Sequence, residues 1–198
     1  QFELYLDLAE HIYMGLVLHY LFIDSQEQLW IGLNSGLYCC LLGETPQLID
    51  SDCHVTYITE LPQSMAIGTT CDLRIYSKDR NLLQKLCPDT YVQSLLPLPN
   101  KEILLIGTFN CGVKSISLSS WQEQPVKNGS LPHTPIRSMI EMTPSTVLLG
   151  FDGDGVYTYN LSSGEAEPLF TRTNRMLTAM GVYSLCRDCE DNIWIGTY

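Results

Sequence analysis

Two carboxylates lie two residues apart in Asp152-Gly-Asp154-Gly155, and this is the acidic cluster best suited to chemistry. Paired carboxylates can bind Ca²⁺ or serve as acid and base in glycoside hydrolysis. The segment lacks the further ligands and the Glu of a calcium loop. Its glycines are typical of a tight hairpin turn. We therefore interpret it as a turn and assign no catalytic residue.

Metal chemistry has little support in the cysteines and histidines. The chain has eight Cys, but Cys186-Arg-Asp-Cys189 is the only C-x2-C pair, and structural zinc requires four ligands. The four histidines, at positions 11, 19, 54 and 133, fall at unrelated places in the repeat described below. The sequence predicts no metal site and no cofactor, and the cysteines are interpreted as buried strand residues whose disulfide state stays open.

Ligand binding is the sharper hypothesis, although no contact residue is assigned. In repeated four-stranded sheets, the turns between second and third strands and the links between sheets share one end. The turns here are Asn34-Ser35, Thr70-Cys71-Asp72, Asn110-Cys111 and Asp152–Asp154, and the links include Asp52–His54 and Lys127–Thr134. Their polar groups could hold sugar hydroxyls, and Trp121, Tyr91 or Tyr183 could offer a stacking face.

A five-fold repeat organises these segments. Asp24…Leu29-Trp-Ile-Gly32 returns as Asp188…Ile193-Trp-Ile-Gly196, and weaker copies around Gly68, Gly107 and Gly150 keep the apolar run and the Gly. The mean period is about 41 residues, close to the ~40–45 residues of one four-stranded propeller blade. The weaker copies lack both the Trp and the Asp; their residues at the Asp position are Glu60, Pro99 and Met142.

The apolar pattern predicts many short strands. We expect them at Leu16–Asp24, Leu29–Leu33, Gly36–Leu42, Gln47–Asp50, Val55–Glu60, Ser64–Thr69, Leu73–Ser77, Leu82–Leu86, Val92–Leu96, Ile103–Thr108, Gly112–Leu118, Trp121–Pro125, Ile136–Met142, Thr146–Phe151, Gly155–Leu161, Ala166–Phe170, Val182–Asp188 and Asn192–Tyr198. Two further strands, Glu3–Asp7 and His11–Gly15, precede them.

The predicted fold is an all-β propeller of four-stranded antiparallel blades. One domain covers residues 1–198, with half-blades at 1–15 and 182–198 and four complete blades at 16–52, 53–90, 91–134 and 135–181. The half-blades complement each other, so the chain either closes a five-bladed ring or belongs to a larger one, of which seven blades is our preferred interpretation.

The repeated Trp, Gly and Asp have structural explanations. A Trp on the second strand can pack between neighbouring sheets, and the Gly after it allows close backbone approach or a bulge. The Asp six residues before the Trp is expected to bind backbone amides in a turn.

Composition excludes some functions. The net charge of −11, with 11 scattered basic residues among 198, argues against nucleic-acid binding by this segment. The apolar run from Ile12 to Ile23 is shorter than the ~20 residues that a membrane span requires. Because the chain does not begin with Met and shows no signal peptide, we interpret it as a piece of a longer protein.

At the two sharp copies, Asp24…Leu29-Trp-Ile-Gly32…Gly36-Leu37 and Val182-Tyr-Ser-Leu…Asp188…Asn192-Ile-Trp-Ile-Gly-Thr197, the sequence resembles the two-component regulator propeller repeat. That family forms the periplasmic sensor region of Bacteroides-type hybrid two-component systems, where seven-bladed propellers precede a transmembrane helix, a histidine kinase, a receiver and a DNA-binding region.

The resemblance implies a periplasmic sensor anchored in the inner membrane through the parent protein. It implies recognition of an oligosaccharide, control of polysaccharide-utilisation genes and homodimerisation, with the kinase outside these residues. This segment is then no enzyme. Two alternatives stay open at this point: a protein-interaction or dimerisation propeller without a small ligand, and a propeller-fold glycosidase or lyase.

Overall fold

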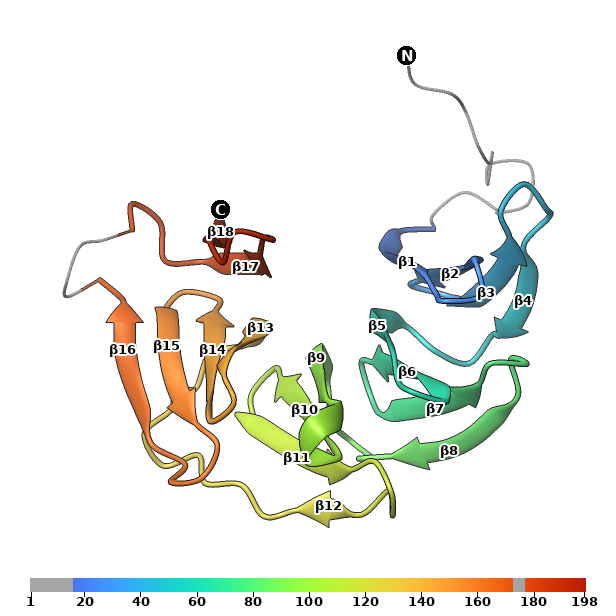
Figure 1. The fold of residues 1–198 in the computed structure, drawn as a ribbon. Helices are drawn as coiled ribbons and strands as arrows, with labels where there is room; N and C mark the ends of the chain where they lie inside the picture. The colour runs from blue at the N-terminus through green and yellow to red at the C-terminus, as the bar shows by residue number, and fades with distance from the viewer. Residues whose placement is uncertain (1–15, 173–176) are drawn as a thin grey trace. The chain divides into compact units, whose positions relative to one another are not determined.

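The computed structural model describes residues 16–172 and 177–198, and the chain divides into two compact units, 1–88 and 89–198 (Figure 1). Unit 1 contains two four-stranded antiparallel sheets. The strands of the first are β1 (Leu18–Ile23), β2 (Gln28–Leu33), β3 (Gly36–Leu41) and β4 (Gln47–Asp50). Those of the second are β5 (Val55–Glu60), β6 (Ser64–Thr69), β7 (Leu73–Ser77) and β8 (Leu82–Leu86).

Unit 2 contains two more four-stranded sheets and a strand pair. The third sheet has β9 (Val92–Leu98), β10 (Ile103–Thr108), β11 (Val113–Ser117) and β12 (Glu123–Gln124), with a short 3₁₀ helix, η1 (Pro99–Lys101), after β9. The fourth has β13 (Ile136–Thr143), β14 (Thr146–Phe151), β15 (Gly155–Asn160) and β16 (Ala166–Phe170). The pair is β17 (Val182–Arg187) and β18 (Ile193–Thr197).

These sheets confirm the predicted fold class, a β-propeller of four-stranded antiparallel blades. Among the described residues, every ladder joins strands that are neighbours in the sequence, in the order expected for a blade. The predicted strands agree with the structure to within two residues at most ends, and the outer strand near Trp121–Pro125 is reduced to Glu123–Gln124. Strands at Glu3–Asp7 and His11–Gly15 fall outside the described residues. The single domain, the blade boundaries and ring closure stay predictions.

In unit 1 the repeated Trp packs between sheets, as predicted. Trp30 is fully buried on β2, in one apolar cluster with Val55 and Ile58 of β5 and with Tyr76 of β7. The second Trp differs. Trp194 on β18 is 64% exposed, because no third strand of the pair and no further sheet covers it among the described residues.

The Asp of the repeat forms the turn that was predicted. Asp24 Oδ1 accepts hydrogen bonds from the amides of Gln26 and Gln28, at 2.9 and 3.0 Å. Its other oxygen accepts the indole N–H of Trp30 at 2.8 Å, a bond that the spacing alone did not reveal. Asp188 repeats all of this with the amides of Glu190 and Asn192 and the indole of Trp194, also at 2.8 Å.

The repeated Gly permits close approach of the next sheet, as one of its two explanations required. A Cβ on Gly32 would lie 2.4 Å from Val55 Cγ1, and one on Gly150 would lie 2.7 Å from Val182 Cγ1. Val55 and Val182 each begin the first strand of the following sheet. We call the first strand of each sheet its innermost strand. The Gly therefore sets how closely consecutive sheets pack within a unit.

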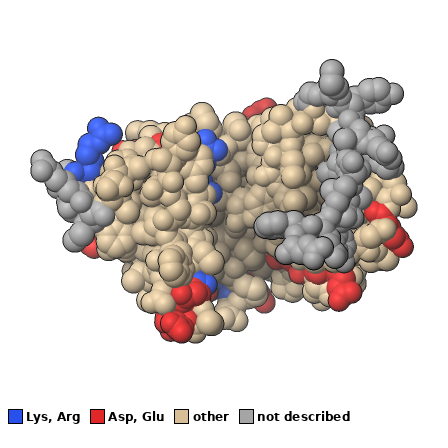
Figure 2. Space-filling view, turned by 90° about the horizontal axis from the view of Figure 1, so that it is seen from above, with Lys and Arg blue, Asp and Glu red and all other residues tan. Residues whose placement is uncertain are grey.

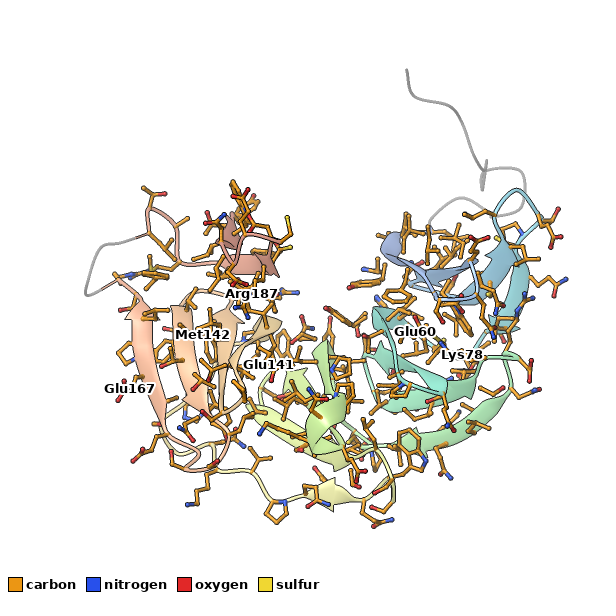
Figure 3. The ribbon with its side chains drawn as sticks, in the orientation of Figure 1. Glu60, Lys78, Glu141, Met142, Glu167 and Arg187 are labelled. Carbon is orange, nitrogen blue, oxygen red and sulfur yellow. The ribbon has the colours of Figure 1, made fainter. Side chains whose placement is uncertain are left out.

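Polar contacts also join consecutive sheets in unit 1. Arg74, which is 2% exposed, pairs with Asp50 of the preceding sheet and with Asp72, at 2.7 and 3.0 Å. The Tyr76 hydroxyl donates to Asp50 as well. Glu60, which replaces the repeat Asp, instead binds Lys78 and the amide and hydroxyl of Ser25 in the preceding sheet; Figure 3 shows Glu60 and Lys78 side by side.

Apolar clusters and buried hydroxyls join the sheets of unit 2. One cluster contains Leu105, Ile136 and Phe151, and another contains Leu148, Val182 and Leu185. Ser94 Oγ donates to the carbonyl of Ile136 at 2.7 Å, and Ser138 Oγ accepts the amide of Leu185 at 2.9 Å. Both serines occupy the same repeat position, opposite the repeated Gly on the neighbouring strand.

No helix in the described part of the chain has the length and apolar character of a membrane span.

Candidate functional site

One backbone hydrogen bond recurs in every sheet and defines what we call its loop end. It runs from the amide just after the second strand to the carbonyl of the link just before the first. The five pairs are Asn34 to Val17, Thr70 to His54, Phe109 to Tyr91, Asp152 to Pro135 and Tyr198 to Gly181, at 2.9–3.1 Å. The turns and links that the sequence analysis singled out therefore do share one end of each sheet.

A β-bulge follows each of these links. In every innermost strand among the described residues, the pairing register skips the second residue. Bulges re-aim a side chain relative to the regular alternation. The bulged residues are His19, Thr56, Gln93, Arg137 and Tyr183.

In unit 2 the three bulged side chains meet. Arg137 Nη1 donates to Gln93 Oε1 at 2.7 Å, and the guanidinium carbon of Arg137 lies 5.2 Å from the ring centroid of Tyr183. Arg137 also donates twice to Asp152 Oδ2, through Nε at 3.1 Å and Nη2 at 2.8 Å. We call Gln93, Arg137, Asp152 and Tyr183 the arginine row.

The arginine row combines rigidity with access. Gln93 is buried, whereas the side chains of Arg137 and Asp152 are 31% and 28% exposed and Tyr183 is 48% exposed. An ion pair of this kind, together with a cation–π contact, fixes the orientation of both partners. The row therefore offers prearranged polar groups beside an accessible aromatic face.

Further aromatic side chains lie at the loop end of unit 2. Tyr91 and Phe109 are stacked, with ring centroids 5.0 Å apart and planes 9° apart, and Phe109 is 42% exposed. Tyr198, nearly fully exposed, lies 6.0 Å from Tyr183 between ring centroids. Exposed aromatic faces with few polar neighbours are suited to stacking against a ligand ring.

The acidic turn has the structure that was expected of a turn. Asp152 is paired with Arg137, and Asp154 accepts the hydroxyl of Thr134 at 2.6 Å. Gly153 and Gly155 have φ of 114° and 84°, which favours glycine. Among the described residues no three His, Cys, Asp or Glu side chains gather as a metal site. A separate hollow of about 350 Å³ lies beside Asp154, and Tyr157 and Arg172 also line it.

Other sequence-predicted site residues do not join the arginine row. Trp121 lies at the opposite end of its sheet, where its amide donates to the carbonyl of Ser117. Asn128 in the long link binds both backbone groups of Val113, at 2.8 and 2.9 Å, so its amide is used structurally. Cys111 is held by Thr108 Oγ1 through its own amide, at 2.8 Å.

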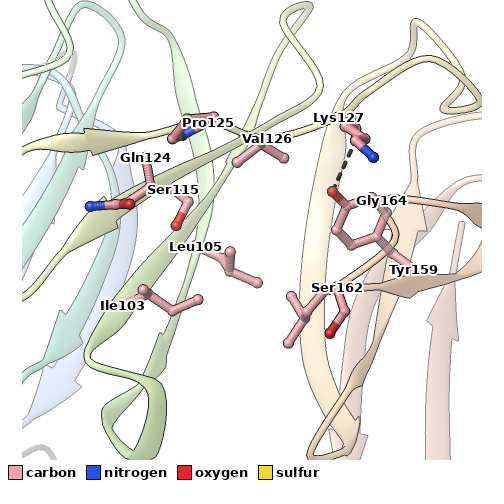
Figure 4. Close-up of a pocket in the computed structure, with 11 residues that line it drawn as sticks. Ile103, Leu105, Ser115, Gln124, Pro125, Val126, Lys127, Tyr159, Ser162 and Gly164 are labelled. Carbon is pink, nitrogen blue, oxygen red and sulfur yellow. Dashed lines mark hydrogen bonds between the residues drawn. The ribbon is translucent and has the colours of Figure 1, made fainter.

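A second hollow in unit 2 is less suited to a polar ligand. It has a volume of about 230 Å³ and lies between the third and fourth sheets, with Ile103, Leu105, Val126 and Leu161 among its lining residues (Figure 4). The hydroxyl of Tyr159 at its wall already donates to the carbonyl of Lys127 at 3.0 Å. Ser115, Gln124 and Ser162 also line this hollow, but only the arginine row combines an ion pair with an accessible aromatic face among the described residues, so we place the candidate site there.

Sequence reasoning named Tyr91, Tyr183 and Asp152 and missed Gln93, Arg137 and Phe109. The signal was present in the aligned repeats. The second residue of each innermost strand is polar or aromatic in all five copies, although its neighbours are mainly apolar. We did not predict a bulge at this repeat position. Without the bulge, the sequence gives no indication that the side chains of Gln93 and Arg137 are in contact.

Comparison with known proteins rests on structure, since neither a family model nor a curated protein matches this sequence. The extracellular domain of BT4673 from B. thetaiotaomicron, described as a hybrid two-component system, is similar with a TM-score of 0.75 and 20% identity, over 88% of this chain and 25% of that one. The corresponding domain of BT3049, of the same description and organism, gives a TM-score of 0.76 and 17% identity, over 91% and 27%.

The computationally designed Ika8 protein is also similar, with a TM-score of 0.66 and 11% identity, over 91% of this chain and 58% of that one. At these identities the likeness shows a shared fold. The natural relatives are nevertheless of the kind that the repeat motifs predicted, extracellular domains of hybrid two-component systems. The chain spans about a quarter of the length of those domains.

Proposed function

We propose that this chain forms part of the extracellular, periplasmic sensor region of a hybrid two-component signal-transduction protein and binds an oligosaccharide at the arginine row. The observation that carries the proposal is the side-by-side placement of Gln93, Arg137 and Tyr183 from three consecutive innermost strands. The shared fold with extracellular domains described as hybrid two-component systems supports it.

The chemistry of the row favours a sugar. Tyr183 presents an exposed ring face, Gln93 and Asp152 supply amide and carboxylate groups, and Arg137 holds them in place. Sugar rings combine apolar C–H faces with hydroxyls that both donate and accept, so they match such a mixed site. The net charge of −11 does not favour a polyanionic ligand; Figure 2 shows one face of the molecule, on which Lys and Arg side chains are few.

The segment acts by binding, not by catalysis. A ligand with higher affinity for one arrangement of a sensor dimer shifts the population toward that arrangement. The parent protein then carries the signal across the inner membrane to a histidine kinase outside these residues and on to polysaccharide-utilisation genes. Homodimerisation and the membrane anchor belong to that parent.

A thermal-shift screen of this chain against neutral and acidic oligosaccharides tests the proposal. A ligand at 100 times its Kd stabilises the folded state by about 2.7 kcal/mol, which raises Tm measurably. We expect a selective rise that Tyr183→Ala abolishes. Trp121→Ala is the matched control, because this aromatic residue lies at the opposite end of its sheet.

Three outcomes contradict the proposal in different ways. No shift with any sugar argues against carbohydrate sensing by this chain. A shift that survives Tyr183→Ala moves the site away from the arginine row. Product formation in any positive sample makes the chain an enzyme.

A further inference from the structure

Two histidines that are 35 residues apart in the sequence meet at the loop end of unit 1. His19 Nε2 lies 2.9 Å from His54 Nε2, with ring centroids 4.6 Å apart and planes tilted by 42°. His19 is the bulged residue of β1, and His54 ends the link just before β5. The repeat alignment placed the two in different columns, so the sequence did not suggest their contact.

Backbone hydrogen bonds hold both residues in place. The carbonyl of His54 accepts the amide of Thr70 at 3.1 Å. Val17, two residues before His19, exchanges two bonds with Asn34, one through the Asn34 amide at 3.1 Å and one through its side-chain oxygen at 3.0 Å. The two imidazoles are therefore presented by fixed backbone, which lowers the entropy lost on binding a shared ligand.

The spacing of the two nitrogens fits a metal ion. With metal–nitrogen bonds of about 2.0–2.1 Å, two imidazole nitrogens are about 2.9 Å apart at a right angle and about 3.3 Å apart in a tetrahedron. The observed 2.9 Å matches the first arrangement, which Cu²⁺ and Ni²⁺ prefer, and a small side-chain movement reaches the second, which Zn²⁺ prefers.

The protonation state also suits a metal. The 2.9 Å contact between the two ring nitrogens requires that at least one of them be an unprotonated acceptor, as a metal ligand must also be. In the neutral pair one Nε2 donates to the other, and a metal needs the tautomer with both protons on Nδ1. Neither Nδ1 has a hydrogen-bond partner among the described residues, so that tautomer is accessible by exchange with water.

We propose that His19 and His54 form a binding site for a divalent transition-metal ion, Ni²⁺, Cu²⁺ or Zn²⁺, through their two Nε2 atoms. No third His, Cys, Asp or Glu completes the site in the described part of the chain, so water or an external ligand fills the remaining positions. His19 is exposed and His54 half-buried, which gives the ion a path from solvent. The site is open and exchangeable, unlike a structural zinc site.

Isothermal titration with NiCl₂, CuCl₂ and ZnCl₂ tests this on the full chain. Four cysteines are exposed and could bind the same metals, so the thiols are first blocked with N-ethylmaleimide. We expect one ion per chain. Loss of a residue that only hydrogen-bonds to a metal ligand already costs about 10–100-fold in affinity, so His19→Asn and His54→Asn should each weaken binding at least tenfold. His133→Asn, at an exposed position in unit 2, should bind as the unaltered chain does.

A pH series gives a second readout. Metal binding requires neutral imidazoles, so affinity should fall as the pH is lowered from 7.5 to 5.5, near the ordinary histidine pKa of about 6.5. Absence of binding at 1 mM metal overturns the proposal. So does binding that survives either substitution, since both nitrogens are required, or binding that His133→Asn removes.

Discussion

The Asp–Trp turn occurs twice with the same bonds and very different burial. Asp24 and Trp30 are buried, whereas Trp194 is 64% exposed and Asp188 is partly so. An unsatisfied group costs about 1–3 kcal/mol when it is buried, whereas water replaces the lost partner at an exposed site. The two turns therefore form an internal comparison of the same chemistry in two environments.

We expect Asp24→Ala to lower the free energy of unfolding by about 2–4 kcal/mol, because it leaves the Trp30 indole and two amides without an acceptor. Asp188→Ala should cost clearly less, because water can replace the lost acceptor at this more exposed turn. Urea denaturation monitored by circular dichroism measures both. Equal losses would show that burial does not decide the contribution of this turn.

The ionisation of Asp188 offers a second test at this scale. Hydrogen bonds from the Trp194 indole, from the Asn192 side chain and from the amides of Asn192 and Glu190 lower its pKa to about 2. Because the folded pKa is below the unfolded value of about 3.9, the turn stabilises the fold above pH 4 and loses this contribution between about pH 4 and pH 2.

NMR titration of the Asp188 carboxyl carbon should give this low pKa, and Trp194→Phe should raise it. If Trp194→Phe leaves the pKa of Asp188 unchanged, the hydrogen bond from the indole is not the main cause of the low pKa.

At the scale of the element, the repeated Gly controls how closely successive sheets pack. A Cβ at position 32 would overlap Val55 of β5. Overpacking of this kind costs about 1–3 kcal/mol, and Gly32→Ala should lower stability by that amount. Gly129 provides the control substitution Gly129→Ala, because a Cβ added there would have no neighbouring atom within 4 Å and its φ is not positive.

The double substitution Gly32→Ala with Val55→Ala tests the mechanism. If the clash with Val55 Cγ1 is responsible, the double variant loses less stability than the sum of the two single ones. Simple additivity would point to a backbone effect of the Gly itself. Urea denaturation of the four proteins completes the cycle.

The buried Arg74 joins two sheets through charges. Removing one partner of a buried ion pair costs about 3–5 kcal/mol, because an uncompensated charge is left behind. We expect Arg74→Met to cause a loss of that size, since Asp50 and Asp72 would lose their shared cation. Arg74→Lys keeps the charge but not the fork of donors, and thermal denaturation should place it between Arg74→Met and the unaltered chain.

Sequence reasoning was strongest for elements that depend on local pattern. Strands such as Gln47–Asp50, Ser64–Thr69 and Ala166–Phe170 were predicted to the residue, because apolar alternation and turn residues lie within the strand or beside it. The Asp24 turn was predicted for the same reason. Its indole bond was not, because spacing gives no side-chain direction.

The candidate site was harder to predict. It depends on a bulge in each innermost strand and on contacts between residues 44 or more positions apart, such as Gln93 with Arg137. No local signal states that two bulged residues will face each other. The difference in burial between Trp30 and Trp194 was not predicted either, because the motif is local whereas the residues that cover a Trp come from other strands.

At the scale of the whole molecule, the excess of acidic residues affects stability through the net charge. The net charge of −11 means that self-repulsion opposes the compact state. The Debye length falls from about 30 Å at 0.01 M salt to about 8 Å at 0.15 M, so added salt screens this repulsion. We expect Tm to rise as NaCl increases from 0.01 to 0.15 M.

Choline chloride at the same ionic strength separates screening from specific sodium binding. Both salts should raise Tm equally if screening is the cause. A fall in Tm would show that favourable ion pairs such as Arg74–Asp50 and Arg137–Asp152 outweigh the excess negative charge.

The Asp188 turn also indicates how the chain can fold. It retains every bond of the Asp24 turn although its Trp is exposed, so these bonds need no neighbouring sheet. All its partners lie within six residues, and in the described part of the chain the ladders join only strands that follow one another in the sequence. Local contacts form before distant ones because they close short loops. Each such hairpin can thus form early, in the order in which the chain is made, and later sheets can be added to those already folded.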